Sequence, residues 1–202
     1  MAKLKFIFSV MNAGKSTHLL QVNHNYKTFG NETIVLSHSL DTRFGKNVVA
    51  SRLGIKINSH SLNSETNVLS LIDNLIKTEY FDKSVRCILV DESQFLTEKQ
   101  VVDLSEVCDN YNIDVICYGL KTDAFGSLFE GSKALLEYAD SFEELKQLCF
   151  CGRKATMVRM FDSDGNVVKE SETNISIGSE EKYISLCRYH WKTITNVSDI
   201  NP

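Results

Sequence analysis

The sequence has a single proline and only ten glycines among its 202 residues, which leaves little room for disordered linkers. It also has no apolar run long enough to span a bilayer. The short apolar run after Lys5 leads into a glycine loop, unlike an export signal. We therefore expect a cytoplasmic protein without a membrane partner, folded as one domain or as one domain with a small appendage.

Positive charge is not in excess, because 22 Lys and Arg residues face 26 Asp and Glu residues and the net charge is -4. This balance argues against a broad electropositive surface for duplex nucleic acid, but it permits a local cationic pocket for a small anionic ligand. In a cytoplasmic protein the six cysteines are expected to be thiols or metal ligands rather than disulfides.

An apolar run from Phe6 stops at the small residues of the G-K-S-T sequence at 14–17, and a helical pattern follows. A strand that feeds such a turn directs successive backbone N–H groups inward, and the helix adds the positive end of its dipole. We predict a phosphate-binding loop in which Lys15 contacts the outer phosphates and Ser16 binds magnesium. The alternative is an ordinary strand-to-helix turn. The residues expected to contact nucleotide here are Ser9, Val10, Met11, Asn12, Ala13, Gly14, Lys15 and Ser16.

The first strand is followed by a helix that ends near Gly30 and then by a second strand, with short joints between them. This order forms a right-handed crossover between parallel strands, so the chain is predicted to have an α/β fold with a parallel sheet. Apolar spacing and turn signals predict the remaining elements. These are a strand at 33–36, a polar loop with a small hairpin at 37–61, a helix at 64–77, a strand at 85–90, a capping box at 97–100 that opens a helix, a strand at 115–118 and a loop at 119–131.

Two acids, Asp91 and Glu92, follow the apolar run at 85–90, at the strand end where α/β sheets place their ligands. If this strand neighbours the first strand, Asp91 lies near the phosphate loop, where such folds hold magnesium through water. Side chains alternate along a strand, so Glu92 is expected to point away from Asp91 and to act as a general base. The alternative is a pair of solvated acids.

Two further loops offer candidate residues. Arg43, in the polar loop after the second strand, is a candidate second cation near a transferred phosphoryl group, although most loop arginines are simply solvated. In the loop at 119–131, Phe125 and Phe129 either line a pocket or pack on the core.

The composition changes after about residue 143, which divides the chain into a core at 1–143, a small metal-binding unit at 144–192 and a polar tail at 193–202. The small unit contains C-x-C and, after a hairpin-length insert, C-x-x-H, a pattern with which small domains hold tetrahedral zinc. Because these four ligands leave no open position, we predict a structural metal. The ligands are Cys149, Cys151, Cys187 and His190, whereas Cys87, Cys108 and Cys117 lie in apolar patterns and are read as core thiols.

Taken together, these motifs resemble the type II thymidine kinases. The match runs to about Trp191 through M-N-A-G-K-S-T at 11–17, D-T-R at 41–43, V-D-E-S-Q-F at 90–95, the two metal motifs and I-G-x-x-x-K-Y at 177–183. The resemblance implies a RecA-like P-loop core with a zinc subdomain and a lasso loop. It also implies transfer of the γ-phosphate of ATP to the 5′-hydroxyl of thymidine for nucleotide salvage and DNA synthesis, use of deoxyuridine, feedback inhibition by dTTP and a homotetramer.

The resemblance also implies roles for individual residues. Lys15, Arg43 and Glu92 match the catalytic residues. Asp41, Asp91, Ser93 and Gln94 match residues around the nucleotide and its magnesium. The nucleoside pocket would be formed by Met11, Leu120, Phe129, the lasso residues Asn174, Ile175, Ser176, Ile177 and Gly178, and Tyr183. Backbone groups of the lasso pair with the N3–H and O4 of thymine, and cytosine would leave them unpaired.

Three positions depart from the family pattern. Ser9 stands where the family usually has glycine, which changes the conformational freedom at the loop entrance. Ala124 stands where an aromatic ring normally stacks on thymine, with Phe125 one place later, so the stacking partner is open. The first metal pair is C-x-C where many members have C-x-x-C.

Two other functions share some of these features. A zinc-ribbon P-loop ATPase stimulated by nucleic acid would use the same loop, acids and cysteines, but the acidic balance and the lack of a basic and aromatic stripe argue against it. A zinc-tied scaffold that binds nucleotide without turnover would leave Glu92 without a role.

Overall fold

The computed structural model describes residues 1–41, 45, 47–169 and 182–200. Its centre is a six-stranded sheet with the strand order β5-β2-β6-β7-β1-β8, and each pair of neighbouring strands is parallel. This confirms the predicted α/β class with a parallel sheet. The strands are β1 (Leu4–Ser9), β2 (Glu32–His38), β5 (His60–Leu62), β6 (Val85–Asp91), β7 (Asp114–Leu120) and β8 (Ser141–Glu144).

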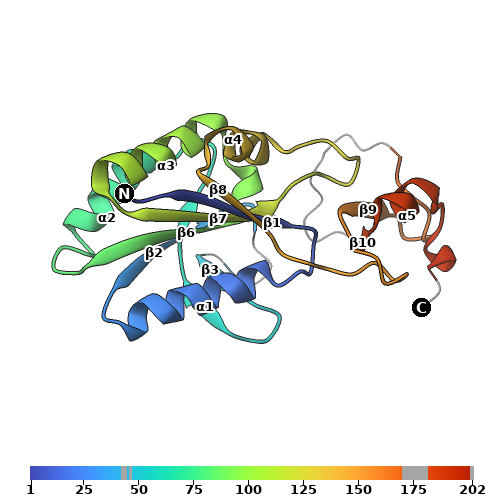
Figure 1. Cartoon of the computed structure of the whole chain (residues 1–202), viewed down its shortest axis with the longest axis horizontal. Helices are drawn as coiled ribbons and strands as arrows, with labels where there is room; N and C mark the ends of the chain where they lie inside the picture. Colours follow the sequence, from blue (N-terminus) through green and yellow to red (C-terminus); the bar gives the residue numbers. More distant parts are fainter. Residues whose placement is uncertain (42–44, 46, 170–181, 201–202) are drawn as a thin grey trace.

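Helices cover both faces of the sheet, as Figure 1 shows. One face packs against α1 (Lys15–Thr28), and the other packs against α2 (Val68–Lys77), α3 (Glu98–Tyr111) and α4 (Glu130–Tyr138). A short hairpin of β3 (Val48–Ala50) and β4 (Lys56–Asn58) confirms the one predicted within 37–61. None of the described helices has the length and apolarity needed to cross a membrane.

The central strand β6 is apolar because both of its faces are covered by helices. Residues 87–90 of this strand are fully buried. Cys87 is one of them, and burial raises its pKa to about 12. Cys108 and Cys117 are also buried, with their pKa values raised by the same loss of solvation. The three thiols therefore stay protonated in the core, as the sequence predicted.

The helix ends follow local capping chemistry. The predicted capping box of α3 is present, with Thr97 and Gln100 each accepting a hydrogen bond from the backbone N–H of the other. Helix α2 begins at Val68, four residues later than the start predicted at 64. The reason is that the side chain of Asn67 accepts from the Ser70 N–H at 2.8 Å and caps the helix there.

The strand order does not meet the condition on which the sequence placed Asp91 near the phosphate loop. The loop strand β1 and the acid-bearing strand β6 are not neighbours, because β7 lies between them. The edge strands β5 and β8 and the helix α4 were also not predicted. The edge strands are three and four residues long, so they contain too few residues to show a period.

A small second layer of structure lies beside one end of the sheet, at the right of Figure 1. It contains the antiparallel pair β9 (Met157–Phe161) and β10 (Lys182–Leu186), the helix α5 (Arg188–Thr193) and the 3-10 helix η2 (Val197–Asp199). We call this part, residues 148–169 and 182–200, the small unit. It has its own hydrophobic cluster, in which Ile194 is buried and Val197 and Ile200 are packed. The segment after Thr193, expected to be a polar tail, is thus attached to the small unit as far as Ile200.

Candidate functional site

The predicted phosphate loop connects the end of β1 at Ser9 to the start of α1 at Lys15. Asn12 and Gly14 both have positive φ angles, of 65° and 84°, so the chain alternates its handedness within a few residues. Such alternation turns successive N–H groups into one concavity, and the first turn of α1 lies directly behind it. The loop has the backbone shape of an anion site.

Ser9 occupies the loop entrance without distorting it. Its side chain is buried and its hydroxyl donates to the Val10 carbonyl oxygen at 2.9 Å. Lys15 donates from Nζ to the same carbonyl oxygen, also at 2.9 Å. The lysine thus folds back across the loop, which keeps its charge beside the concavity.

Asp91 at the end of β6 and Ser16 in the first turn of α1 meet, even though β1, which leads into the loop, is not a neighbour of β6. The Ser16 hydroxyl donates to Asp91 Oδ2 at 3.1 Å. Because Asp91 is buried and faces the negative charge of Glu92, its pKa is raised above the usual range for an aspartate, while Lys15 and the Ser16 hydroxyl oppose the shift. A hydroxyl and a carboxylate together are ligands that magnesium prefers, and a cation here would offset the cost of burying the acid.

Glu92 does not continue the strand, so the expected alternation with Asp91 does not describe its position. It has a φ of 52° and begins the 3-10 helix η1 (Ser93–Phe95). Its N–H donates to Asp91 Oδ1 at 3.0 Å. A non-glycine residue in the left-handed region is uncommon, and such strain is concentrated at functional sites.

Gln94 holds the Glu92 carboxylate in place. Its Nε2 donates to Glu92 Oε2 at 2.6 Å, and its Oε1 accepts from the Leu120 N–H at 3.0 Å. Gln94 is only 2% exposed, so this link between η1 and the end of β7 is shielded from water. Gln94, which the sequence placed beside the nucleotide, thus joins the turn that carries Glu92 to the end of β7.

Ser93 is fully buried and packs against two glycines. A Cβ at Gly119 would lie 2.8 Å from the Ser93 hydroxyl, and a Cβ at Gly131 would lie 2.4 Å from the Ser93 carbonyl oxygen. Strand β7 and helix α4 therefore approach η1 more closely than any larger residue would allow. This packing fixes the turn that carries Glu92.

His38, which had no role in the sequence-based prediction, lies at the end of β2 beside this turn. The register pairs Ser37 with Asp91, and His38, one residue beyond that pair, lies close enough to Glu92 for the glutamate charge to affect its pKa. Its Nδ1 accepts from the Leu40 N–H at 3.3 Å, and its Nε2 is buried with no partner among the described residues. Burial lowers the pKa of His38, and Glu92 partly opposes this shift.

The residues expected around the nucleoside are placed on several elements. Leu120 ends β7, Phe129 precedes α4, and the Phe129 ring meets Phe95 edge-on with centroids 5.9 Å apart. Ala124 is buried, and Phe125 is half-buried next to it. Neither phenylalanine belongs to a core cluster in the described residues.

The other candidates lie beside the small unit, after β2 or outside the described residues. Met11 and Tyr183 both pack against the cluster of the small unit, and Asp41 follows β2 with its N–H bonded to the His38 carbonyl oxygen at 3.0 Å. The remaining predicted residues lie outside the described part of the chain. They are Arg43, Asn174, Ile175, Ser176, Ile177 and Gly178.

Two side chains that the sequence gave no reason to select touch the phosphate loop from outside. Ser185 in β10 donates to the Met11 carbonyl oxygen, and Gln147 donates to the Asn12 carbonyl oxygen, each at 2.9 Å. Both contacts join residues more than a hundred positions apart, so no local spacing could have revealed them. They connect the loop to the small unit and to the segment that leads into it.

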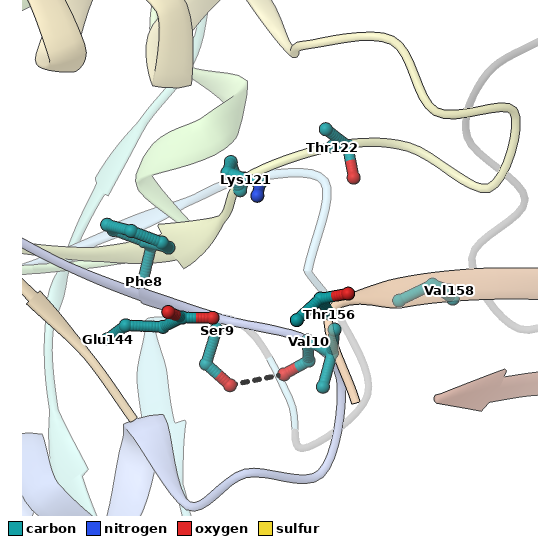
Figure 2. Close-up of a pocket in the computed structure, with 8 residues that line it drawn as sticks. All are labelled: Phe8, Ser9, Val10, Lys121, Thr122, Glu144, Thr156 and Val158. Atoms are coloured by element: carbon teal, nitrogen blue, oxygen red, sulfur yellow. Dashed lines mark hydrogen bonds between the residues drawn. The ribbon is translucent and has the colours of Figure 1, made fainter. Parts of the chain in front are cut away.

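A small cavity lies at the entrance of the loop, where the sheet and the small unit meet (Figure 2). The sheet side carries a carboxylate and a lysine, and the small unit contributes a hydroxyl and an apolar side chain. Glu144, one of these groups, forms an ion pair with Lys154. The lining residues are Phe8, Ser9, Val10, Lys121, Thr122, Glu144, Thr156 and Val158.

The four predicted metal ligands converge. Their ligand atoms all lie within 4.8 Å of one another. The Cys149 Sγ lies 3.3 Å and the Cys187 Sγ 3.6 Å from His190 Nδ1, and the Cys151 and Cys187 sulfurs are 4.0 Å apart. Zn–S bonds of about 2.3 Å in a tetrahedron place two sulfurs about 3.8 Å apart, so the donor set fits zinc.

The surroundings of the cluster favour metal binding. Arg153 donates from Nε to the Cys151 Sγ at 3.4 Å and lowers the pKa of that thiol to about 6. The ring of Phe150 stacks on His190 with centroids 4.3 Å apart, which orients the imidazole. All six cysteines are free thiols, as expected for ligands and core residues rather than disulfides.

Comparisons with known proteins give consistent results. A family model described as thymidine kinase matches residues 2–191. A thymidine kinase from Rhodopirellula baltica is 50% identical over 192 residues, which cover 95% of this chain and 89% of that protein. A thymidine kinase from Haemophilus influenzae is 48% identical over 95% of this chain and 97% of its own length. One from Yersinia pseudotuberculosis is 47% identical, covering 95% of each chain.

Proposed function

This chain belongs to the thymidine kinase family, and from that premise we propose that it transfers the γ-phosphate of ATP to the 5′-hydroxyl of thymidine, forming thymidine monophosphate for nucleotide salvage. The observation that carries the proposal is the convergence of Lys15, Ser16, Asp91 and Glu92 at the ends of β1 and β6. Together they supply a cation for the phosphates, two oxygen ligands for magnesium and a candidate base for the 5′-hydroxyl.

The phosphate loop binds the polyphosphate of ATP through its inward N–H groups and through Lys15. On binding, Lys15 exchanges its hydrogen bond to the Val10 carbonyl for the outer phosphates, where its charge stabilises the transition state. Ser16 and Asp91 hold the magnesium that accompanies ATP, and this ion neutralises charge on the phosphates when it is bound.

Glu92 takes the proton of the 5′-hydroxyl. Its turn holds the carboxylate next to Asp91, and Gln94 donates a hydrogen bond to one of its oxygens. A positioned base of this kind contributes about 10²- to 10⁴-fold in rate. Asp41 and Arg43 are proposed to complete the polar side of the site.

The nucleoside is proposed to bind between the loop at 119–131 and the lasso at 174–178. Met11, Leu120 and Phe129 line its base, with Ala124 or Phe125 at the stacking position, and Tyr183 lies on the sugar side. Backbone groups of the lasso pair with N3–H and O4 of thymine, so thymidine and deoxyuridine are accepted and deoxycytidine is rejected.

The Cys₃His cluster is proposed to hold a structural zinc ion. Its four ligands close the coordination sphere, which leaves no position for a substrate. By the same family resemblance we propose a homotetramer that is inhibited by dTTP and acts in the cytoplasm.

A panel of nucleosides tests this function. The purified chain is mixed with MgATP and, in turn, with thymidine, deoxyuridine, deoxycytidine or single-stranded DNA, and the release of ADP and of nucleoside monophosphate is measured. We expect ADP and thymidine monophosphate in equal amounts, with no response to deoxycytidine or DNA. ADP release that rises with DNA and ignores nucleosides would instead favour the ATPase alternative.

A further inference from the structure

Two side chains outside the sheet donate hydrogen bonds to backbone carbonyl oxygens of the phosphate loop. Ser185 lies 174 positions from Met11, whose carbonyl oxygen it binds, and Gln147 lies 135 positions from Asn12, whose carbonyl oxygen it binds. The two carbonyls belong to consecutive peptide groups. They flank Asn12, the residue that turns the loop with a φ of 65°.

Fixing these carbonyls also fixes two of the loop's donors. A trans peptide is planar, so the C=O of one residue and the N–H of the next point in opposite directions. The bond from Ser185 therefore aims the Asn12 N–H away from the small unit, and the bond from Gln147 aims the Ala13 N–H away from the segment that leads into that unit. These are N–H groups of the concavity in which the phosphates are proposed to bind.

Apolar packing supports the same arrangement. Val10 is 6% exposed and belongs to the hydrophobic cluster of the small unit, and Met11 packs against that cluster. Ser185 lies two positions before the metal ligand Cys187, in a strand that is paired along its whole length with β9. The outer side of the loop is thus part of the core of the small unit.

We propose that Ser185 and Gln147 are positioning residues of the phosphate loop, through which the small unit and the segment that leads into it set the affinity for the phosphates of the nucleotide. The proposal rests on the proposed function for the identity of the nucleotide. It does not depend on which nucleoside is phosphorylated.

The test compares Ser185→Ala and Gln147→Met with the unchanged protein, by calorimetric titration with MgADP and, separately, with thymidine. Each variant loses one hydrogen bond that orients a loop amide, so we expect MgADP binding to weaken about fivefold in each. Gln147→Met also removes the acceptor of the Leu148 N–H, which lies outside the loop. Thymidine binding should change less than MgADP binding in each variant, because the lost bonds are to backbone carbonyls of the phosphate loop. Ser185→Thr keeps the hydroxyl and should restore MgADP affinity.

A matched control is available in α3. Ser105 donates to the Val102 carbonyl oxygen at 2.7 Å, so Ser105→Ala also removes one serine-to-carbonyl bond, away from the loop. It should leave MgADP affinity unchanged. The proposal is overturned if Ser185→Ala and Gln147→Met bind MgADP like the unchanged protein, or if each weakens MgADP and thymidine equally.

The surface position of Gln147 keeps the test valid even if Ser185→Ala folds poorly, because Gln147→Met alters no buried group of the small unit. The outcome is also separable from that of the proposed function. A protein that binds MgADP with the expected dependence on Gln147 but phosphorylates no nucleoside would support this inference and refute the kinase assignment.

Discussion

The bridge formed by Gln94 offers a sharp test of how the site is built. Gln94→Met replaces the amide by an apolar group of similar length and removes both of its hydrogen bonds, to Glu92 at 2.6 Å and from Leu120 at 3.0 Å. The Leu120 N–H then lacks its acceptor, which costs about 1–3 kcal/mol, and the bond to a charged carboxylate is worth about 1.5–3 kcal/mol. We therefore expect the free energy of unfolding to fall by roughly 3 kcal/mol or more.

The same change should slow catalysis. Without the Gln94 donor the Glu92 carboxylate loses one of the contacts that orient it, and part of the contribution of the base is lost. Because a general base contributes about 10²- to 10⁴-fold, we expect kcat to fall by about 10- to 100-fold, with a smaller change in the KM for ATP. The assay is steady-state ADP release with thymidine, together with urea unfolding.

Gln100 provides the matched control, because it is equally buried, at 2% exposure, and its amide donates to the Asn63 and Thr66 carbonyl oxygens. Gln100→Met should lower stability to a similar extent while kcat stays within about twofold of the unchanged protein. If Gln94→Met loses no more activity than Gln100→Met, the bridge does not orient the base and the reasoning fails.

Three other predictions concern the cap, a histidine and the metal cluster. Thr97→Ala removes the cap of α3 and should lower the free energy of unfolding by about 1 kcal/mol in urea titrations without changing kcat, and an unchanged midpoint would contradict the role of the cap. Burial lowers the pKa of His38 below its ordinary 6.5. The unfolded chain therefore binds more protons below that pH, and the free energy of unfolding falls as the pH drops through 6.5. His38→Gln should lack this loss of stability, and parallel curves of stability against pH for the two proteins would refute the argument. Cys149→Ser should reduce bound zinc from about one ion per chain and lower the melting temperature, whereas Cys108→Ser should leave the zinc content unchanged.

Those parts of the fold and site that depend on neighbouring residues could be predicted from the sequence. The G-K-S-T loop, the apolar strand before Asp91, the capping box at Thr97 and the paired metal ligands each carry their signal within a few positions. Their chemistry is local, because a turn, a cap or a chelating pair needs only particular residue types at a short spacing.

The remaining features depend on contacts between distant segments. The position of β7 between β1 and β6 is set by how the whole sheet packs, and no spacing within either strand reports it. Glu92 leaves the strand because a left-handed turn begins η1, and the sequence D-E-S-Q-F contains no glycine to signal that turn. The first turn of α4 contains Gly131, which lies close against η1, and Ser132, which donates to the Leu120 carbonyl oxygen, and these two small residues weaken its helical pattern.

The hydrogen bonds from Ser185 and Gln147 to the phosphate loop could not be predicted from the sequence either. A serine in an alternating strand and a glutamine before a cysteine motif are ordinary surface choices, and only the folded structure brings them to the loop carbonyls. The packing of Ile194, Val197 and Ile200 was missed because these apolar residues are spaced by polar ones in a short segment.

The most direct test of the central claim is to measure turnover and nucleotide binding together in Glu92→Gln. The account predicts that thymidine phosphorylation with MgATP falls by about 10²- to 10⁴-fold, while the dissociation constant for MgADP stays within about threefold of the unchanged protein. Full phosphorylation of thymidine by Glu92→Gln, or a loss of MgADP binding as large as the loss of turnover, would contradict it.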